Sequence, residues 1–311
     1  MCGDDARRVR PDWVPQSLYP FESRYMDLLG HRMHYVDEGE GPTLLLLHGN
    51  PTWSFLYRHL IIGLRSRFRC VAPDYPGFGL SRARPGYDFR AASQADAVGA
   101  FIQRLDLRGV IAFGQDWGGP IMLHAASRDP ARFEGFVIGN TWGWPLDGDP
   151  HFERFARLLG GPVGGWAIRW FNAFVNWMIP LGLHRARLSR VEMDAYRGPF
   201  ATGTAREATH VFPGELIAAR QFLIEVESGL TRLRHVPALI VWGTRDFALR
   251  RRERERFERE FPNHETVLLD HAAHFIQEDA PGEIARAILR RWPGRAAGST
   301  APLRPAVGEG R

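Results

Sequence analysis

The chain has 311 residues, of which 44% are hydrophobic, so it can bury one large core together with an inserted element. Its formal net charge is +5 and it contains no lysine, which excludes a Schiff-base lysine and the lysine of a Walker motif. Two cysteines, Cys2 and Cys70, do not make a disulfide framework, and we expect Cys70 to be a buried small hydrophobic residue. The arginine-dense stretch at 250–256 alternates with glutamate, which is typical of a solvated helix face, so we expect no nucleic-acid partner.

The two ends of the chain show no targeting or membrane-spanning pattern. No apolar run approaches the length of a membrane span, and the first residues lack an apolar signal segment, so we expect a cytoplasmic protein with no membrane partner. Residues 1–20 are polar and predict a loosely ordered lead-in. Residues 295–311 are rich in Gly, Ala, Pro and Arg and predict a disordered tail.

Strand and helix patterns alternate along the first part of the chain. Two short patterns, at 24–28 and 33–36, predict a hairpin at the edge of a sheet. The uninterrupted run TLLLL at 43–47 predicts a strand that is covered on both faces. The next predicted elements are a helix at 55–64, a strand at 69–74, a helix at 91–105 and a strand at 110–113. This alternation predicts a doubly wound parallel sheet, which binds ligands at the carboxyl ends of its strands.

The alternation stops after a predicted strand at 136–142. Residues 144–213 predict a small helical cap, because aromatic residues recur there at helical spacings; they are Trp166, Trp170, Phe171, Phe174 and Trp177. Such a stripe is more often core than pocket, so we expect these side chains to form the core of the cap. The cap follows a strand end directly and is therefore a candidate lid that excludes water.

The sheet resumes after the cap. Strands are predicted at 238–243 and 266–269, followed by a last helix at 282–292. Residues 21–143 and 214–294 are therefore predicted to form one α/β core that the cap interrupts.

The sequence GQDWGG at 114–119 lies between the strand at 110–113 and a predicted helix. Gly114 and Gly118 flank Asp116 at two positions on either side, which favours a sharp strand-to-helix turn that exposes the central side chain, a nucleophile elbow. A carboxylate is ionised at neutral pH, so Asp116 can attack carbon without a base and leave an ester on the enzyme. The alternative interpretation is a Gly-rich junction with an N-capping aspartate and no chemistry.

Two further candidates follow later strands. Asp246 comes after the strand at 238–243, and His274 comes after the strand at 266–269. The order nucleophile, acid, base is the chain order of α/β-hydrolase triads. The pattern of Asp270, His271 and His274 also suggests a metal pair, but a third ligand at zinc spacing is missing, so we expect no metal and no other cofactor.

Three motifs together resemble the haloalkane dehalogenases of the α/β-hydrolase superfamily. They are HGNP at 48–51, GQDWGG at 114–119 and HFIQE at 274–278, and the likeness runs over residues 18–292. Most members of the superfamily have no tryptophan after the nucleophile, so the pair Asn50 and Trp117 is the discriminating feature. The resemblance implies a mostly parallel eight-stranded sheet flanked by helices, with a helical cap domain inserted after the sixth strand.

The resemblance also implies a role for each candidate. A halide that leaves an sp3 carbon develops negative charge in a dry pocket, where the Asn50 amide and the Trp117 indole N–H would stabilise it. The backbone N–H groups of the same two residues are expected to hold the oxyanion of the second step. Asp116 would displace halide from a small halogenated hydrophobic substrate, and His274, oriented by Asp246, would activate the water that frees the alcohol.

One large subgroup of the family places a glutamate after the strand that here ends at Asn140. This chain has no carboxylate there, so Asp246 is the expected acid. The combination of Asn50, Trp117 and Asp246 with the sequence NTW at 140–142 is similar to the third dehalogenase subgroup.

Four alternatives are weighed against this interpretation. The β-lactone decarboxylases of olefin biosynthesis share the same motifs and would use Asp116 to attack a strained ring carbon. Epoxide hydrolases rely on cap tyrosines, and the insertion holds only Tyr196. Fluoroacetate dehalogenases typically carry arginine where this chain has Trp117. A non-catalytic fold that binds a small apolar ligand or a protein partner under its lid is the alternative outside the enzymes.

Overall fold

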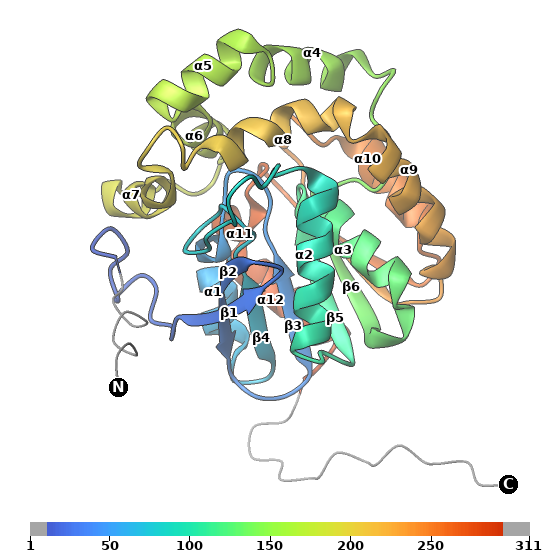
Figure 1. The fold of residues 1–311 in the computed structure, drawn as a ribbon. Helices are drawn as coiled ribbons and strands as arrows, with labels where there is room; N and C mark the ends of the chain where they lie inside the picture. The colour runs from blue at the N-terminus through green and yellow to red at the C-terminus, as the bar shows by residue number, and fades with distance from the viewer. Residues whose placement is uncertain (1–10, 295–311) are drawn as a thin grey trace, which may run out of the picture.

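In the computed structural model, residues 11–294 are described, and eight strands form one sheet in the order β1-β2-β4-β3-β5-β6-β7-β8 (Figure 1). The pairs β1–β2 and β2–β4 are antiparallel, and every other neighbouring pair is parallel. The strands are β1 Arg24–Leu28, β2 His31–Glu38, β3 Thr43–Leu47, β4 Arg69–Pro73, β5 Val110–Gln115, β6 Phe133–Gly139, β7 Ala238–Gly243 and β8 His264–Leu269. The predicted α/β-hydrolase fold with a mostly parallel eight-stranded sheet is confirmed.

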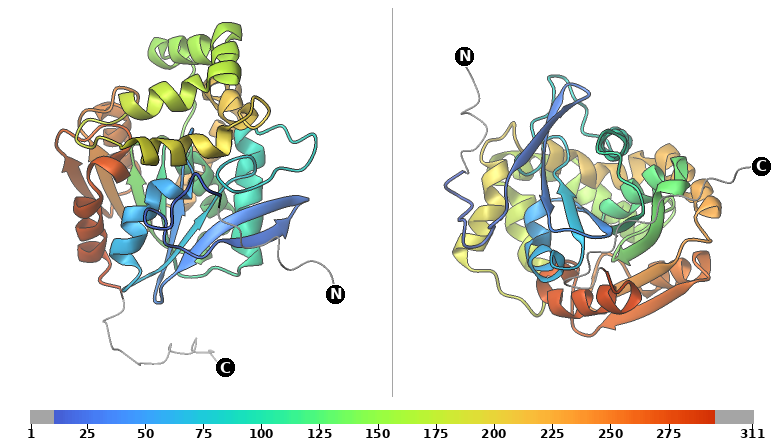
Figure 2. Two further views of the ribbon diagram at one scale, coloured as in Figure 1. Left: turned by 90° about the vertical axis from the view of Figure 1, so that its left-hand side faces the viewer. Right: turned by 90° about the horizontal axis from the view of Figure 1, so that it is seen from below.

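The central strands are buried on both faces, as their apolar runs predict. Every residue of β3, β5 and β7 is buried. Helices α1 (Arg58–Leu64) and α12 (Pro281–Arg291) pack together on one face of the sheet, and α2 (Ala91–Arg104) and α3 (Gly118–Arg128) on the other (Figure 2). Also packed against α3 is α9 (Arg220–Gly229), while α10 (Arg251–Glu260) connects β7 to β8.

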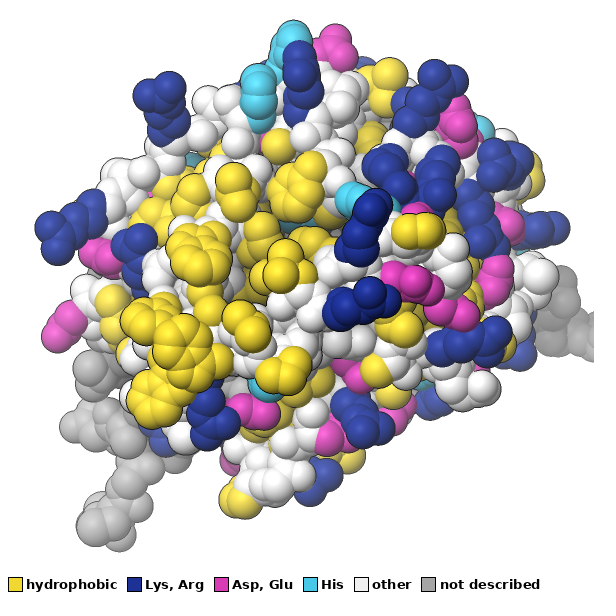
Figure 3. Space-filling view, turned by 90° about the horizontal axis from the view of Figure 1, so that it is seen from above, with side chains coloured by type: hydrophobic (Ala, Val, Ile, Leu, Met, Phe, Trp, Pro, Cys, Tyr) yellow, Lys and Arg dark blue, Asp and Glu magenta, His cyan; other side chains and the backbone are white. Residues whose placement is uncertain are grey.

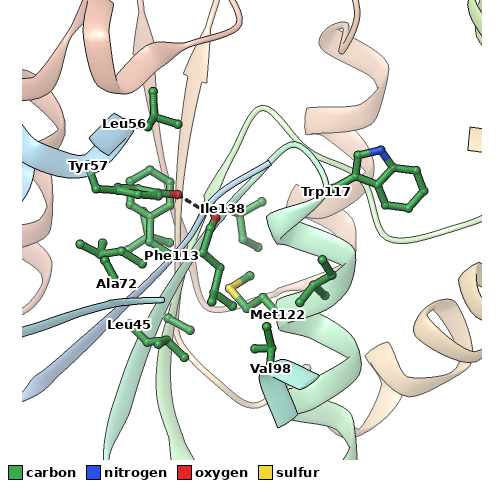
Figure 4. Close-up of a cluster of buried hydrophobic side chains, with 14 of the residues drawn as sticks. Leu45, Leu56, Tyr57, Ala72, Val98, Phe113, Trp117, Met122 and Ile138 are labelled. Carbon is green, nitrogen blue, oxygen red and sulfur yellow. Dashed lines mark hydrogen bonds between the residues drawn. The ribbon is translucent and has the colours of Figure 1, made fainter. Parts of the chain in front are cut away.

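Apolar side chains fill the space between the sheet and these helices. Figure 4 shows Tyr57, Phe113 and Ile138 in this core, with the Tyr57 hydroxyl donating to the carbonyl oxygen of Leu47 at 2.9 Å. The Trp117 indole points away from this cluster, beyond the start of α3 (Figure 4). The elbow therefore has a rigid floor and presents its own side chains on the other side.

Strand β3 pairs in parallel with both β4 and β5, so the strands that follow it in the chain are added first on one side of β3 and then on the other. The loops that leave the carboxyl ends of β3 and β5 turn to opposite faces of the sheet and leave a crevice between them. Asn50 follows β3 and Asp116 follows β5, so the topology brings these two residues together at the crevice.

A layer of helices between β6 and β7 lies over this end of the sheet (Figures 1 and 2). It comprises α4 (Pro150–Leu159), α5 (Pro162–Phe171), a π-helix at Phe174–Met178, α6 (Ile179–Leu181), α7 (Arg190–Arg197) and α8 (Glu207–Ala218). We refer to this layer as the cap. Pro213, where we expected the insertion to end, lies inside α8.

The expectation that the aromatic stripe forms the core of the cap is wrong for four of its five members. Only Phe174 is buried, whereas Trp166, Trp170, Phe171 and Trp177 are between 57% and 67% exposed. The reason is that the cap is a single layer. Helix α5 turns its small face, with Gly164, Gly165 and Ile168, inward, and within residues 11–294 no further layer covers its outer face (Figure 1).

Other expectations concern single residues and the two ends. Cys70 is buried and unpaired, as predicted, and burial raises the pKa of its thiol to about 12. Residues 1–10 of the predicted lead-in and the predicted disordered tail at 295–311 lie outside the described residues. Within residues 11–294, no helix has the length and apolar character needed to cross a membrane.

Candidate active site

The turn after β5 holds Asp116 in the left-handed region, with φ at +52°. Its backbone is fixed from the next strand, because Asp116 N–H donates to the Asn140 carbonyl at 3.0 Å and the Thr141 hydroxyl donates to the Asp116 carbonyl at 2.6 Å. A Cβ atom at Gly114 would lie 2.7 Å from the Gly118 carbonyl oxygen, so the turn requires glycine there. Helix α3 begins without a side-chain capping bond, so Asp116 does not serve as its N-cap.

Backbone donors hold the Asp116 carboxylate. The Asn50 N–H donates to Oδ2 at 2.8 Å, and the Trp117 N–H also donates to the carboxylate. Burial raises the pKa of Asp116, while His274 and these two N–H groups act in the opposite direction. The other oxygen, Oδ1, lies 3.7 Å from His274 Nε2. One oxygen of the carboxylate is thus anchored, and the other faces the imidazole.

Asp246 orients the imidazole of His274. His274 Nδ1 lies 2.9 Å from Asp246 Oδ2, and the side chain of Asp246 has no exposed surface. Oδ2 also accepts from Asn140 Nδ2 at 2.7 Å, and Oδ1 accepts from the N–H groups of Ala248 and Leu249 at 2.8 and 3.2 Å. A carboxylate with four partners is fixed in place, so it accepts the proton of Nδ1–H and turns Nε2 toward Asp116.

The charge of the two carboxylates controls the protonation of His274. Burial alone would lower the pKa of the imidazole, but Asp246 and then Asp116 raise it to about 9. At neutral pH the imidazole is therefore protonated as long as both carboxylates are charged. Neutralising Asp116 would remove one of the two contributions that keep the proton on His274.

Gln115 is a contact of the imidazole that the sequence analysis did not single out. Its Nε2 lies 3.1 Å from His274 Nε2 and donates to the His274 carbonyl at 3.1 Å, while its Oε1 is buried without a partner. Because an amide N–H can donate only to an unprotonated ring nitrogen, this contact favours the neutral imidazole. The residue before the nucleophile thus opposes the effect of the two carboxylates.

A cavity lies between this constellation and the cap. Its empty space is about 610 Å³, including the part that is open to solvent. Asn50, Asp116, Trp117 and His274 line it, and Asp246 lies behind His274. The remaining wall is mainly apolar and comes largely from the cap and the loop after β7: Trp142, His151, Phe152, Phe155, Phe174, Met178, Pro213, Leu216, Phe247, Ala248, Leu249 and Phe275.

Side-chain N–H donors line the elbow side of the cavity. The Trp117 indole packs edge-on against Trp142 with ring centroids 4.8 Å apart, and its N–H has no hydrogen-bond partner within the described part of the chain. The Asn50 amide donates to the Thr209 carbonyl of α8 at 3.3 Å, which leaves its second N–H free. Apolar walls make such donors strong electrostatic partners for an anion.

The short helix α11 (Ile276–Asp279), shortly after His274, joins the His274 loop to the cap. Glu278 pairs with both guanidinium nitrogens of the buried Arg58 and accepts from the Tyr196 hydroxyl of α7. Asp279 accepts from the backbone N–H groups of residues 184–186 in the cap, at distances from 2.8 to 3.2 Å, and from Ala273 N–H at 2.7 Å. The segment that follows His274 therefore also anchors the cap.

The five residues singled out from the sequence thus lie at or directly behind one cavity. Sequence reasoning missed Gln115, Asn140 and Thr141 as parts of the constellation. The signal for Asn140 was present, because it occupies the strand end where a subgroup of similar enzymes carries an acid. Its contact with Asp246 depends on the pairing of β6 with β7, which the sequence does not state.

Comparisons with known proteins agree with this geometry. The family described as "alpha/beta hydrolase fold" matches residues 42–281. Haloalkane dehalogenase 2 of Mycobacterium tuberculosis is 44% identical over 90% of this chain and 99% of its own length. Cis-3-alkyl-4-alkyloxetan-2-one decarboxylase of Xanthomonas campestris is 33% identical over 88% of this chain and 98% of its own.

Solved structures point the same way. The crystal structure of haloalkane dehalogenase DbeA from Bradyrhizobium elkani has a TM-score of 0.79 and 29% identity, covering 87% of this chain and 97% of that one. An elbow with aspartate at its tip, a histidine and an acid behind it, and this degree of likeness lead to one assignment. The chain belongs to the α/β-hydrolase family and, within it, to the haloalkane dehalogenases.

Proposed function

We propose that the protein hydrolyses the carbon–halogen bond of small haloalkanes to a primary alcohol, a halide ion and a proton, through an alkyl ester on Asp116. The observation that carries this proposal is the arrangement of a carboxylate nucleophile opposite a free indole N–H in an apolar cavity, with His274 at 3.7 Å. The family membership supports the same reaction.

In the first step, Asp116 Oδ1 attacks the carbon that bears the halogen. A carbon–oxygen bond forms, and the halide leaves with the electron pair of the broken bond. The Trp117 indole N–H and the free Asn50 amide N–H stabilise the charge that develops on the halogen. Apolar walls exclude the water that would otherwise compete for these donors.

In the second step, His274 acts as the base. Esterification removes the charge of Asp116, which lowers the pKa of the imidazole and releases its proton. Neutral His274 then takes a proton from water, and the resulting oxygen nucleophile attacks the carbonyl carbon of the ester. The oxyanion is held by the Asn50 and Trp117 backbone N–H groups. The bond between the carbonyl carbon and the alkyl oxygen then breaks, and the leaving oxygen takes the proton from His274, so the product is the alcohol and the Asp116 carboxyl group is restored.

The acid of the triad is Asp246 in this proposal. Four hydrogen bonds hold its carboxylate, and its contact with Nδ1 suits the orientation of a base. Asn140 occupies the strand end where another subgroup has its glutamate, and it donates to Asp246. Asn50, Trp117 and Asp246 together support the third dehalogenase subgroup, with residues 144–213 as its cap domain.

A second candidate is the decarboxylation of β-lactones. It is favoured by the 33% identity to the oxetan-2-one decarboxylase over most of both chains. Asp116 would attack a ring carbon in place of a halogenated carbon, and the ring oxygen would leave. Epoxide hydrolysis lacks a cap tyrosine at the cavity, because the Tyr196 hydroxyl donates to Glu278.

The decisive experiment measures halide release and acidification from 1,2-dibromoethane and 1-bromobutane, with the Asp116→Ala variant as the control. Release that disappears in the variant supports the proposal. If folded wild-type protein releases no halide, the proposal fails, and carbon dioxide and alkene formation from a cis-3,4-dialkyl β-lactone then tests the second candidate. A folded protein that gains stability with apolar ligands yet turns over neither substrate class would indicate a non-catalytic binding protein.

A further inference from the structure

The outer face of the cap carries an exposed apolar patch that the active site does not use. We define it as the cap patch, formed by Val163, Trp166, Trp170, Phe171, Trp177 and Leu181, whose side chains are between 57% and 76% exposed. In the view from above, hydrophobic side chains gather over this part of the molecule with arginines at the margins (Figure 3). Contiguous exposed apolar surface of this kind marks an interaction site in soluble proteins.

The patch is ordered by regular structure. Val163, Trp166 and Trp170 recur at helical spacing along one face of α5, and the rings of Trp166 and Phe171 pack edge-on with centroids 5.0 Å apart. Trp177 and Leu181 are four residues apart across the π-helix and α6, which places them on one side. The aromatic side chains therefore form a stiff surface whose ordering on binding costs little entropy.

The segment of chain that carries the patch has charged residues of one sign only. Between Glu153 and Glu192 the chain has six arginines and no acidic residue. Three of them pair with acids from outside this segment, as in Arg169 with Glu207 at 3.9 Å, and Arg154, Arg157 and Arg187 have no ion pair among residues 11–294. All six are exposed. A partner that is complementary to the cap patch and its arginines has an apolar interior and a negatively charged surface.

We propose that the cap patch docks onto a lipid bilayer surface that carries anionic headgroups. Tryptophan side chains favour the boundary between water and hydrocarbon, and arginine stems lie along apolar surface while their guanidinium groups reach the headgroups. A contact with a second copy would bring the unpaired Arg154, Arg157 and Arg187 of both chains to one interface, and like charges brought together in this way are disfavoured. This proposal replaces the sequence-based expectation of no membrane partner; it describes a surface contact and no span.

The cap patch lies on the opposite side of the same helices from the active-site cavity. The π-helix presents Phe174 and Met178 to the cavity, and Trp177 of the same turn lies on the outside. Only one layer of helices separates the bilayer from the cavity. If the proposed function holds, an apolar substrate dissolved in the bilayer reaches the cavity without crossing bulk water, but the docking itself does not depend on that function.

The test uses the full chain with vesicles of phosphatidylcholine alone or mixed with phosphatidylglycerol, read by co-sedimentation and by the tryptophan emission shift. We expect binding to the mixed vesicles that weakens with salt. Replacing Trp166, Trp170 and Trp177 by glutamine should weaken it about tenfold or more. Replacing Arg154, Arg157 and Arg187 by glutamine should weaken it roughly fivefold per arginine at low salt.

A matched control replaces three exposed apolar residues elsewhere, Leu29, Ile62 and Leu268, by glutamine and should leave binding unchanged. Thermal melting verifies that each variant is folded. Absence of binding to phosphatidylglycerol vesicles at low salt overturns the proposal, and so does equal binding by the tryptophan variant. A concentration-dependent dimer that the tryptophan variant abolishes, in protein that ignores vesicles, assigns the patch to self-association.

Discussion

The Asp246 loop and the outer face of α5 differ in how far the protein itself provides contacts for their side chains. Each oxygen of the Asp246 carboxylate has two donors within the protein, whereas Trp166 and Trp170 of α5 face solvent. The hydrogen bonds of the first are complete within the protein, whereas the two tryptophans of the second are not covered by any of residues 11–294. The comparison teaches that the protein fixes the position of the Asp246 carboxylate internally and leaves the outer cap surface exposed.

The largest expected effect comes from replacing His274, whose imidazole the Asp246 carboxylate orients. In His274→Ala, the ester on Asp116 should form but not hydrolyse, so turnover should fall by about 100- to 10,000-fold. Intact-mass measurement after mixing with 1-bromobutane should show the added alkyl group. The matched control is His271→Asn in the same loop, which should turn over normally. Continued turnover by His274→Ala without added mass would remove His274 as the base.

A second change tests how strongly the cap is tied to the core. Arg58→Met leaves Glu278 buried without its guanidinium partner, and breaking such a pair typically costs about 3 to 5 kcal/mol. Urea denaturation should show this loss. The comparison variant, Arg108→Met, breaks an exposed pair with Asp106 and should leave the free energy of unfolding nearly unchanged. Equal losses in both variants would contradict a buried clamp.

A third change tests the donor that faces the leaving halide. Trp117→Phe keeps the ring and removes the N–H, so alkylation should slow by about 100- to 1000-fold while the fold persists. Rapid-mixing measurement of the alkylation step is the readout. Trp144 packs against Phe257 outside the cavity, so Trp144→Phe serves as the control and should react at the wild-type rate. An unchanged rate in Trp117→Phe would show that the indole does not stabilise the halide.

The fourth change concerns the protonation of the base. Asp116→Asn mimics the neutral ester, so the pKa of His274 should fall below its value of about 9. Since this pKa lies above the unfolded value of about 6.5, its stabilising contribution is full below about pH 6.5 and is lost as the pH rises through 9. Imidazole NMR titration measures the shift. A pKa that stays at 9 in Asp116→Asn would break the proposed coupling between ester and base.

The smallest expected effect comes from Gln115→Leu. Its amide N–H favours neutral His274, so its removal should raise the pKa of the imidazole, opposite in sign to Asp116→Asn. The hydrolysis step should then require a higher pH, while the alkylation rate at saturating substrate stays the same. Gln115→Glu adds a negative charge beside the ring and should raise the pKa further. A fall in pKa in Gln115→Leu would contradict this role.

The same comparison explains what could be predicted from the sequence. Asp116, Asp246 and His274 could be predicted from the sequence because each follows a recognisable strand, and parallel strands end at one edge of the sheet. The contacts of Asn140 and Gln115 could not be predicted from the sequence, because they depend on strand register and on the path of the His274 loop.

The aromatic stripe was misjudged for a related reason. Helical spacing of Trp166 and Trp170 identifies a common face, but it does not say what lies against that face. A second layer of helices would have buried these side chains, and the cap has only one. Periodicity therefore predicted the helix correctly and its surroundings incorrectly.

Helix α11 connects motion to chemistry. Glu278 and Asp279 bind the cap only a few residues after His274, so a displacement of the cap would act on the loop that carries His274. An opening of the cap would admit bulk water to the cavity and would displace His274 at the same time. One segment therefore links the position of the cap to the position of the His274 imidazole.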